Sequence, residues 1–100
     1  MEFIQDKDGE RFELHDTTIR HIQQEHRILN PVGFVREVLQ TPDAIVESNW
    51  DAGTYLYYKK QRRGYKVVVA NFTQKLIKTA YLERQLKEGK ILWLNPKVMR

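Results

Sequence analysis

The spacing of apolar residues changes at Pro42, and this change limits the possible fold more than any other feature of the chain. Before Pro42, apolar residues recur at the spacing of helices that bury one side. After it, they alternate with polar residues, as they do in half-buried strands. The sequence therefore predicts an α+β protein with two N-terminal helices packed on a four-stranded antiparallel sheet. A short β-hairpin is expected ahead of the helices.

Turn and cap signals divide the chain into its expected elements. Asp8-Gly9 is a tight-turn signal between "EFIQ" and "RFELH" and predicts the hairpin. Asp16 or Thr17 can cap a helix over about 17–29, and Asn30-Pro31 separates it from a second helix over about 32–40. The strands are expected in "DAIVES", "GTYLYYKK", "YKVVVANF" and "KLIKTAYL", between about 43 and 82, as an antiparallel meander. "ERQLKEGK" is expected to add a helical turn, and "ILWL" a last strand or a docked tail.

Length and composition favour a single globular domain over 1–100. The residues are 41% hydrophobic and 30% charged, which is typical of a folded protein. There is no cysteine, so a disulfide framework and a thiolate zinc site are excluded. No apolar run approaches the roughly 20 residues that a membrane-spanning helix needs, and the N-terminus lacks the pattern of a signal peptide. A cytoplasmic protein is therefore expected.

Charge is distributed unevenly along the chain. Residues 1–54 contain five basic and eleven acidic side chains, a net charge of −6. Residues 55–100 contain twelve basic and two acidic side chains, a net charge of +10. This asymmetry indicates a partner that carries phosphate groups, and RNA is the partner expected here. The alternative is that the basic side chains only form a hydrated surface.

Two histidines lie on the first expected helix. On a helix with about 100° per residue, Ile19, Ile22 and Leu29 fall on one side, and His26 falls between them. His21 lies nearer the rim of the same helix. The pattern predicts that His26 packs toward the sheet while His21 is more exposed. The two histidines diverge on the helix, and no cluster of acidic residues and histidines has convincing metal-ligand spacing, so neither a metal nor a cofactor is expected.

The chain contains the types of polar residue that can cleave RNA without a metal. The 2′-hydroxyl of RNA can attack the adjacent phosphate when a base accepts its proton and an acid protonates the leaving oxygen. Histidine suits both tasks because its ordinary pKa lies near neutrality. Lysine, arginine, threonine and tyrosine can stabilise the charge on the phosphoryl oxygens. Such residues occur in most basic domains, so composition alone does not decide the function.

Four short motifs occur in an order that resembles a known group of nucleases. They are "HIxxxH" on the first helix, "EVLxTPDxI" at the end of the second, a central "VVV" strand and a closing "KTAYL". In this order, from Thr17 to about Leu82, they resemble phage-associated nuclease-like domains of the barnase–EndoU–colicin–RelE fold. One position departs from the pattern, because Arg27 follows the second histidine where proline is expected.

The resemblance implies a toxin-like endoribonuclease that needs no metal. It places a catalytic histidine on the first helix, a catalytic serine or threonine on the last strand and a basic residue on an intervening strand. Carried over, the expected catalytic residues are His21, His26, Lys59 and Thr79. The expected RNA-binding residues are Tyr55, Tyr57, Lys60, Arg62, Arg63 and Tyr81, with the tyrosines available to stack on bases.

Each of these residues also has an ordinary structural explanation. His26 can be a core histidine, Thr79 a good strand former, and Tyr55 and Tyr57 a pair of cross-strand packing residues. The alternative function is a non-catalytic module of a phage or mobile element that binds nucleic acid or protein. A free ribonuclease would harm its host, so an acidic antitoxin or immunity protein is an expected partner.

Overall fold

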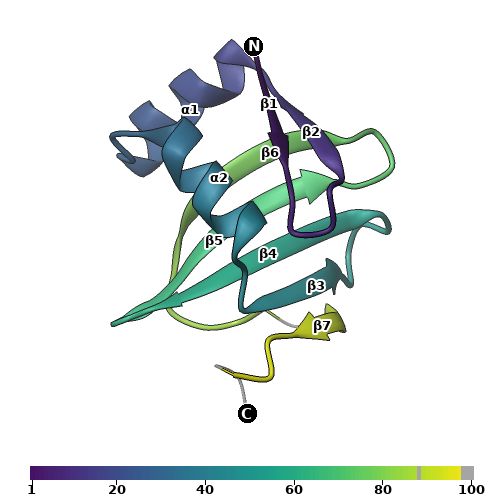
Figure 1. Ribbon diagram of the computed structural model, residues 1–100. Coiled ribbons are helices and arrows are strands. Elements are labelled where there is room, and N and C mark those ends of the chain that lie inside the picture. Colours follow the sequence, from purple (N-terminus) through teal and green to yellow (C-terminus); the bar gives the residue numbers. More distant parts are fainter. Residues whose placement is uncertain (88, 98–100) are drawn as a thin grey trace.

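The computed structural model describes residues 1–87 and 89–97, which form one seven-stranded sheet and two helices. The sheet has the order β1-β2-β6-β5-β4-β3-β7 (Figure 1). In chain order the elements are β1 (Glu2–Gln5), β2 (Arg11–Leu14), α1 (Asp16–His26), α2 (Pro31–Gln40), β3 (Ala44–Ser48), β4 (Thr54–Gln61), β5 (Gly64–Asn71), β6 (Leu76–Glu83) and β7 (Gly89–Leu94).

The predicted fold class is wrong in the size and type of the sheet. The meander β3–β4–β5–β6 forms where the sequence predicts it and is antiparallel. The N-terminal hairpin, however, joins the same sheet, because β2 pairs in parallel with β6 at Glu13↔Leu76. At the opposite edge, β7 pairs antiparallel with β3. The sheet is therefore mixed and has seven strands, whereas four antiparallel strands were expected.

The segment after β6 also differs from the expectation. A helical turn was expected over 83–90, but β6 continues to Glu83 and Gly89 already belongs to β7. Residue 88 lies outside the described residues. "ILWL" forms most of β7, so the expected last strand is present. The apolar residues of "ILWL" therefore extend the sheet at its edge.

The main core lies between the helices and one face of the sheet. α2 begins at Pro31, and the Asn30 side chain caps it by accepting a hydrogen bond from the Gly33 amide (3.1 Å). Burying an aliphatic side chain fully contributes about 1.5–3 kcal/mol, so this face supplies much of the stability. The residues that α2 contributes to this core are Val35, Val38 and Leu39, which lie on one face of the helix.

Helix α1 packs against β6, at the side of the sheet (Figure 1). It ends earlier than predicted, at His26, because Arg27 adopts the left-handed conformation (φ 55°) that terminates helices. Leu29 consequently lies beyond the helix and is 94% exposed, although its spacing placed it on the apolar side. The C-terminus of α1 therefore brings His26 close to the edge of β6.

A smaller apolar cluster covers the face of the sheet opposite the helices. Its buried members are Ala44, Val46, Leu56, Tyr58 and Val67. Leu86, from the segment that leaves β6, packs on this cluster. The same segment is fixed by the Tyr58 hydroxyl, which accepts a hydrogen bond from the Lys87 amide (3.0 Å). Within the described residues, neither helix has the length and apolar character that crossing a membrane requires.

Candidate active site

The two histidines of α1 meet at the C-terminal end of the helix. Their ring centroids lie 5.3 Å apart with the planes at 78°. His21 is exposed and His26 is half-buried, as the sequence predicts. The His26 ring also contacts the Tyr81 ring of β6, with 5.7 Å between the centroids. A helix end and a strand edge thus bring three ring side chains together.

Tyr81 reaches His26 because of its place on β6. It pairs with Val67, which is buried in the cluster on the face opposite the helices. Beyond Leu76, the outer side of β6 has no strand partner among residues 1–87 and 89–97. Since α1 packs against β6, the end of the helix stands beside this open edge. The Tyr81 ring can therefore contact both the apolar cluster and the helix.

Lys87 completes the group through a second contact with Tyr81. Its ammonium lies 5.2 Å from the centroid of the Tyr81 ring. Interaction with the Tyr81 side chain raises the pKa of Lys87, so the ammonium stays charged at neutral pH. Sequence reasoning missed Lys87, because it follows the last predicted strand and belongs to no motif. We call His21, His26, Tyr81 and Lys87 the His–Tyr–Lys cluster.

Thr79 points to the same face of β6 as Tyr81. The two residues pair with Val69 and Val67, which are likewise two positions apart on β5. The Thr79 hydroxyl is buried and has no hydrogen-bond partner among the described residues. Leaving a buried hydroxyl unpaired costs about 1–3 kcal/mol, so such groups are uncommon in native structures. The hydroxyl thus lies unpaired inside the protein, on the face of β6 that carries Tyr81.

Lys59, which was expected to be catalytic, does not join this group. Its ammonium donates hydrogen bonds to the carbonyl (2.9 Å) and the hydroxyl (3.0 Å) of Thr41, on the helix side of the sheet. The neighbouring Lys60 alternates to the other face, in register with Tyr65 and, across β5, with Glu83. Lys60, and not Lys59, is therefore the basic residue of β4 that shares a face with Tyr81.

The two tyrosines expected to stack on RNA bases lie elsewhere. Tyr57 is 1% exposed, and its hydroxyl donates a hydrogen bond to Asp6 (2.7 Å). Burial and this hydrogen bond raise the pKa of Tyr57 well above its usual value. Tyr55 stacks on Phe72, with ring centroids 4.5 Å apart. Both tyrosines face the helix side, so neither shares a surface with Thr79 and Tyr81.

The arginines of the β4–β5 turn lie at the end of the sheet that β6 reaches after Tyr81. Arg62 and Arg63 are exposed, and Arg63 and Gly64 line an open hollow of about 580 Å³ together with Arg84. A Cβ atom on Gly64 would lie 2.3 Å from the Glu83 carbonyl oxygen, so only glycine permits this close approach. The close contact of Gly64 with Glu83 keeps the β4–β5 turn beside the end of β6. Arg63 and Arg84 therefore border the same hollow.

Metal-ligating groups are not gathered in this site or elsewhere in the described part of the chain. No cluster of three or more histidine, cysteine, aspartate or glutamate side chains could hold a metal ion there. Comparisons of the chain with family models, curated proteins and solved structures find no significant match. The functional argument therefore rests on the geometry of the His–Tyr–Lys cluster and its surroundings.

Proposed function

We propose that the chain is a metal-independent endoribonuclease with its active site where α1 meets β6. The observation that carries the proposal is the contact of two histidines with Tyr81, which Lys87 contacts in turn. Thr79, with an unpaired buried hydroxyl, faces the same side of β6 as Tyr81. A proton acceptor, a proton donor and groups that stabilise negative charge are the requirements of this reaction.

The reaction is an internal displacement at phosphorus. The 2′-oxygen of RNA forms a bond to the adjacent phosphorus, and the bond from phosphorus to the 5′-oxygen of the next nucleotide breaks. One neutral imidazole accepts the 2′-hydroxyl proton, and a protonated imidazole delivers a proton to the leaving 5′-oxygen. The products are a 2′,3′-cyclic phosphate and a 5′-hydroxyl end. His21 and His26 supply the two imidazoles in this proposal.

Lys87 and Thr79 are the groups proposed to act on the phosphoryl oxygens. An ammonium and a hydroxyl that are already in place can stabilise developing charge without reorganising. Tyr81 then positions His26 through ring contact and borders the substrate with its hydroxyl. Arg63, Arg84 and Lys60 are the proposed contacts for flanking phosphates.

The proposed biological role and partner are consistent with this activity. The motif order that resembles the barnase–EndoU–colicin–RelE fold supports a toxin-like role, in the cytoplasm where RNA is available. An acidic antitoxin or immunity protein would bind the same basic surface. A phage or another mobile element is the proposed origin of such a domain.

The test is a cleavage assay on mixed single-stranded RNA in the presence of EDTA. Wild-type protein is expected to cleave with EDTA present and to leave cyclic phosphate ends. Because a positioned acid or base is typically worth about 10²–10⁴ in rate, His26→Ala and His21→Ala should each lower single-turnover cleavage by at least ~100-fold.

The third histidine provides the matched control. His15 is exposed and contacts Glu13 (2.9 Å), outside the cluster, so His15→Ala should cleave like the wild type. The melting temperature separates the two histidines of the cluster, since loss of the half-buried His26 should lower it more than loss of His21. Cleavage abolished by EDTA would disprove the metal-free mechanism. Tight RNA binding without any cleavage would favour a non-catalytic binding module.

A further inference from the structure

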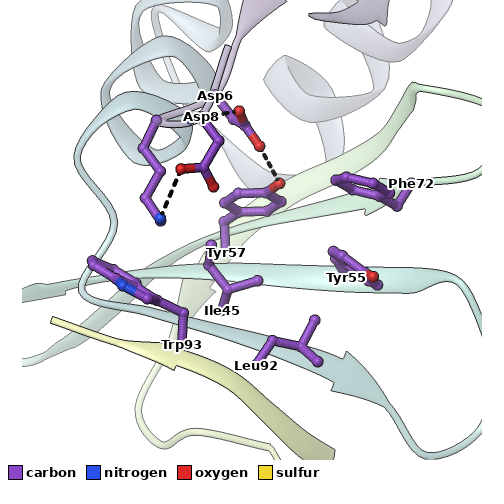
Figure 2. A pocket seen from close by; sticks show the side chains of 9 residues that line it. Asp6, Asp8, Ile45, Tyr55, Tyr57, Phe72, Leu92 and Trp93 are labelled. Carbon is purple, nitrogen blue, oxygen red and sulfur yellow. Dashed lines mark hydrogen bonds and ion pairs between the residues drawn. The ribbon is translucent and has the colours of Figure 1, made fainter. Parts of the chain in front are cut away.

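A pocket of about 240 Å³ opens on the helix side of the sheet, away from the His–Tyr–Lys cluster (Figure 2). The β1–β2 turn borders it on one side, and β7 borders it on the other. Its floor comes from β3 and β4. The residues that line it are Asp6, Lys7, Asp8, Ile45, Tyr55, Tyr57, Phe72, Leu92 and Trp93. Four of these nine side chains are aromatic, so the pocket presents ring surfaces to any occupant.

The border formed by the β1–β2 turn is firmly held. The Asp6 carboxylate is buried and accepts hydrogen bonds from the amides of Asp8 (2.9 Å) and Glu10 (2.9 Å). Its other oxygen accepts the hydrogen bond from the Tyr57 hydroxyl. The Lys7 amide donates to the Leu39 carbonyl at the end of α2 (2.9 Å). The turn is therefore fixed in place before any ligand arrives, which lowers the cost of binding.

Aromatic side chains stand on opposite sides of the opening. Tyr55 and Phe72 stack on each other with an interplanar angle of 23° and form one wall. Trp93 forms the other, and Figure 2 shows the floor residues Ile45 and Tyr57 between the two walls. Binding sites for larger molecules usually exceed about 300 Å³. The pocket thus has the size for one planar ring system and not for an extended ligand.

A hydrogen-bond donor and an acceptor lie side by side at the rim. The Lys7 ammonium lies 4.3 Å from the centroid of the Trp93 ring and donates to one carboxylate oxygen of Asp8 (3.1 Å). Figure 2 shows the Asp8 carboxylate directed toward the pocket. A nucleobase presents the complementary arrangement at its edge, with ring nitrogens or carbonyls as acceptors and an exocyclic amino group as donor.

We propose that this pocket binds a nucleobase that carries an exocyclic amino group, with its ring packed against Tyr55 and Trp93. Asp8 accepts the hydrogen bond from the amino group. The Asp8 carboxylate lies beside the Lys7 ammonium at the rim, and the Asp6 carboxylate is buried behind them, so the pocket disfavours a phosphate and favours a nucleoside over a nucleotide. The site does not depend on the proposed ribonuclease activity, because Thr79 and Tyr81 face the opposite side of the sheet.

The experiment follows amide NMR spectra of the intact protein while adenosine, purine riboside or ribose is added. Purine riboside differs from adenosine only in lacking the amino group. Adenosine should shift the amides of residues 6–8, 55, 72 and 93 and bind at least about 10-fold more tightly than purine riboside, since hydrogen bonds to charged groups are strong. Ribose should shift none of them.

Variants test the assignment of the contacts. Asp8→Asn should weaken adenosine binding by about 10-fold, because the charged acceptor is lost. Tyr55→Ala should weaken it by at least about 5-fold, the lower end of the range for base stacking on an aromatic ring. Glu2→Gln removes the same charge from an exposed position outside the pocket and should leave binding unchanged. Unchanged amide dispersion in each variant shows that the fold survives.

Further ligands identify the source of the base. Adenosine binding more tightly than AMP at the same amides indicates a nucleoside ligand, whereas a short oligoadenylate binding more tightly still indicates a base within RNA. Both results support base recognition in this pocket. Three results would overturn the proposal: no shift with adenosine up to its solubility limit, shifts confined to His26 and Tyr81, or equal binding of adenosine and purine riboside.

Discussion

The hydrogen bond between Tyr57 and Asp6 joins a buried phenol to a buried carboxylate 51 positions away in the chain. Tyr57→Phe keeps the ring but leaves one Asp6 oxygen without its partner. Because an unpaired buried acceptor costs about 1–3 kcal/mol, the free energy of unfolding should fall by that amount at pH 7. Denaturant unfolding measures it. Tyr55→Phe, on the same strand, is the control, and an equal loss in both variants would contradict the prediction.

Tyr57 should also make the free energy of unfolding decrease at alkaline pH. Burial raises the pKa of Tyr57, and burial also raises the pKa of Tyr58. In the unfolded chain a tyrosine ionises near pH 10, so the stability that comes from each neutral phenol is complete below about pH 10. It is lost as pH rises through the raised pKa of each tyrosine. Tyr57→Phe should therefore lose stability less steeply above pH 10 than the wild type does, as measured by denaturant unfolding over a pH series.

Thr79 offers a test that separates chemistry from stability. Thr79→Val keeps the shape of the side chain and its preference for a strand, and it removes the hydroxyl that has no partner in the described structure. The melting temperature should stay constant or rise, because burying a methyl group costs less than burying an unpaired hydroxyl. RNA cleavage should fall at least ~10-fold, since donors that stabilise developing charge are worth about 10²–10³. Full cleavage by the variant would exclude Thr79 from the reaction.

At the scale of elements, the end of α1 decides where the histidines lie. Arg27 holds a left-handed backbone, which costs a residue other than glycine roughly 1–2 kcal/mol. Arg27→Gly should therefore raise the free energy of unfolding by about 0.5–1 kcal/mol, the cost being partly offset by the greater freedom of glycine in the unfolded chain. Arg27→Pro should destabilise the protein, because proline is fixed at a φ of about −65°.

The cleavage rate provides the second measurement on these two variants. Arg27→Gly preserves the end of the helix and should cleave at the wild-type rate. Arg27→Pro displaces His26 from Tyr81 and should cleave more slowly than its loss of stability explains. If Arg27→Pro instead stabilises the fold, the left-handed end of α1 is not a fixed feature of the protein.

Periodicity could predict the elements of this chain but not all of their partners. The change of spacing at Pro42 located both helices and the strands of the meander, because these patterns are local. The parallel contact of β2 with β6 rests on a single register pair, Glu13↔Leu76, and on the hydrogen bond from the Glu13 amide to the Lys75 carbonyl (2.8 Å). Residues more than 60 positions apart leave no periodic signal of such a pairing, so the mixed sheet could not be predicted.

The candidate site was predictable to the same degree. Periodicity placed His26 toward the sheet and His21 outside, and the strand alternation placed Thr79 and Tyr81 on one face. It could not show whether Lys59 or Lys60 shares that face. The alternation along a strand separates the two residues, but it does not show which face of the sheet the helices cover. Lys87 was out of reach, because its position depends on how the segment after β6 returns to β7.

For the whole molecule, the fold reduces the charge asymmetry of the sequence. The basic strands β4, β5 and β6 lie between strands of the acidic half, in the order β2-β6-β5-β4-β3. Within residues 1–87 and 89–97, three ion pairs join the two halves: Lys66 with Glu37, Lys75 with Glu10 and Lys78 with Asp51. Basic charge thus remains concentrated around the β4–β5 turn and the end of β6, on Lys60, Arg62, Arg63 and Arg84.

This distribution predicts which cations bind RNA. Each phosphate contact to a single strand contributes about 0.7 to the slope of log K against log salt, so Lys60→Ala, Arg63→Ala and Arg84→Ala together should reduce the slope by roughly 2. Fluorescence anisotropy over a salt series measures it.

The matched control removes the same charge from the paired lysines, with Lys66→Ala, Lys75→Ala and Lys78→Ala together. Because these ammonium groups already face carboxylates, the control should change the slope little, although it lowers net charge equally. Equal slopes for the two triple variants would mean that RNA responds to net charge and not to the hollow between Arg63 and Arg84. A reduced slope in the first variant alone would place the bound RNA at the end of β6, next to the His–Tyr–Lys cluster.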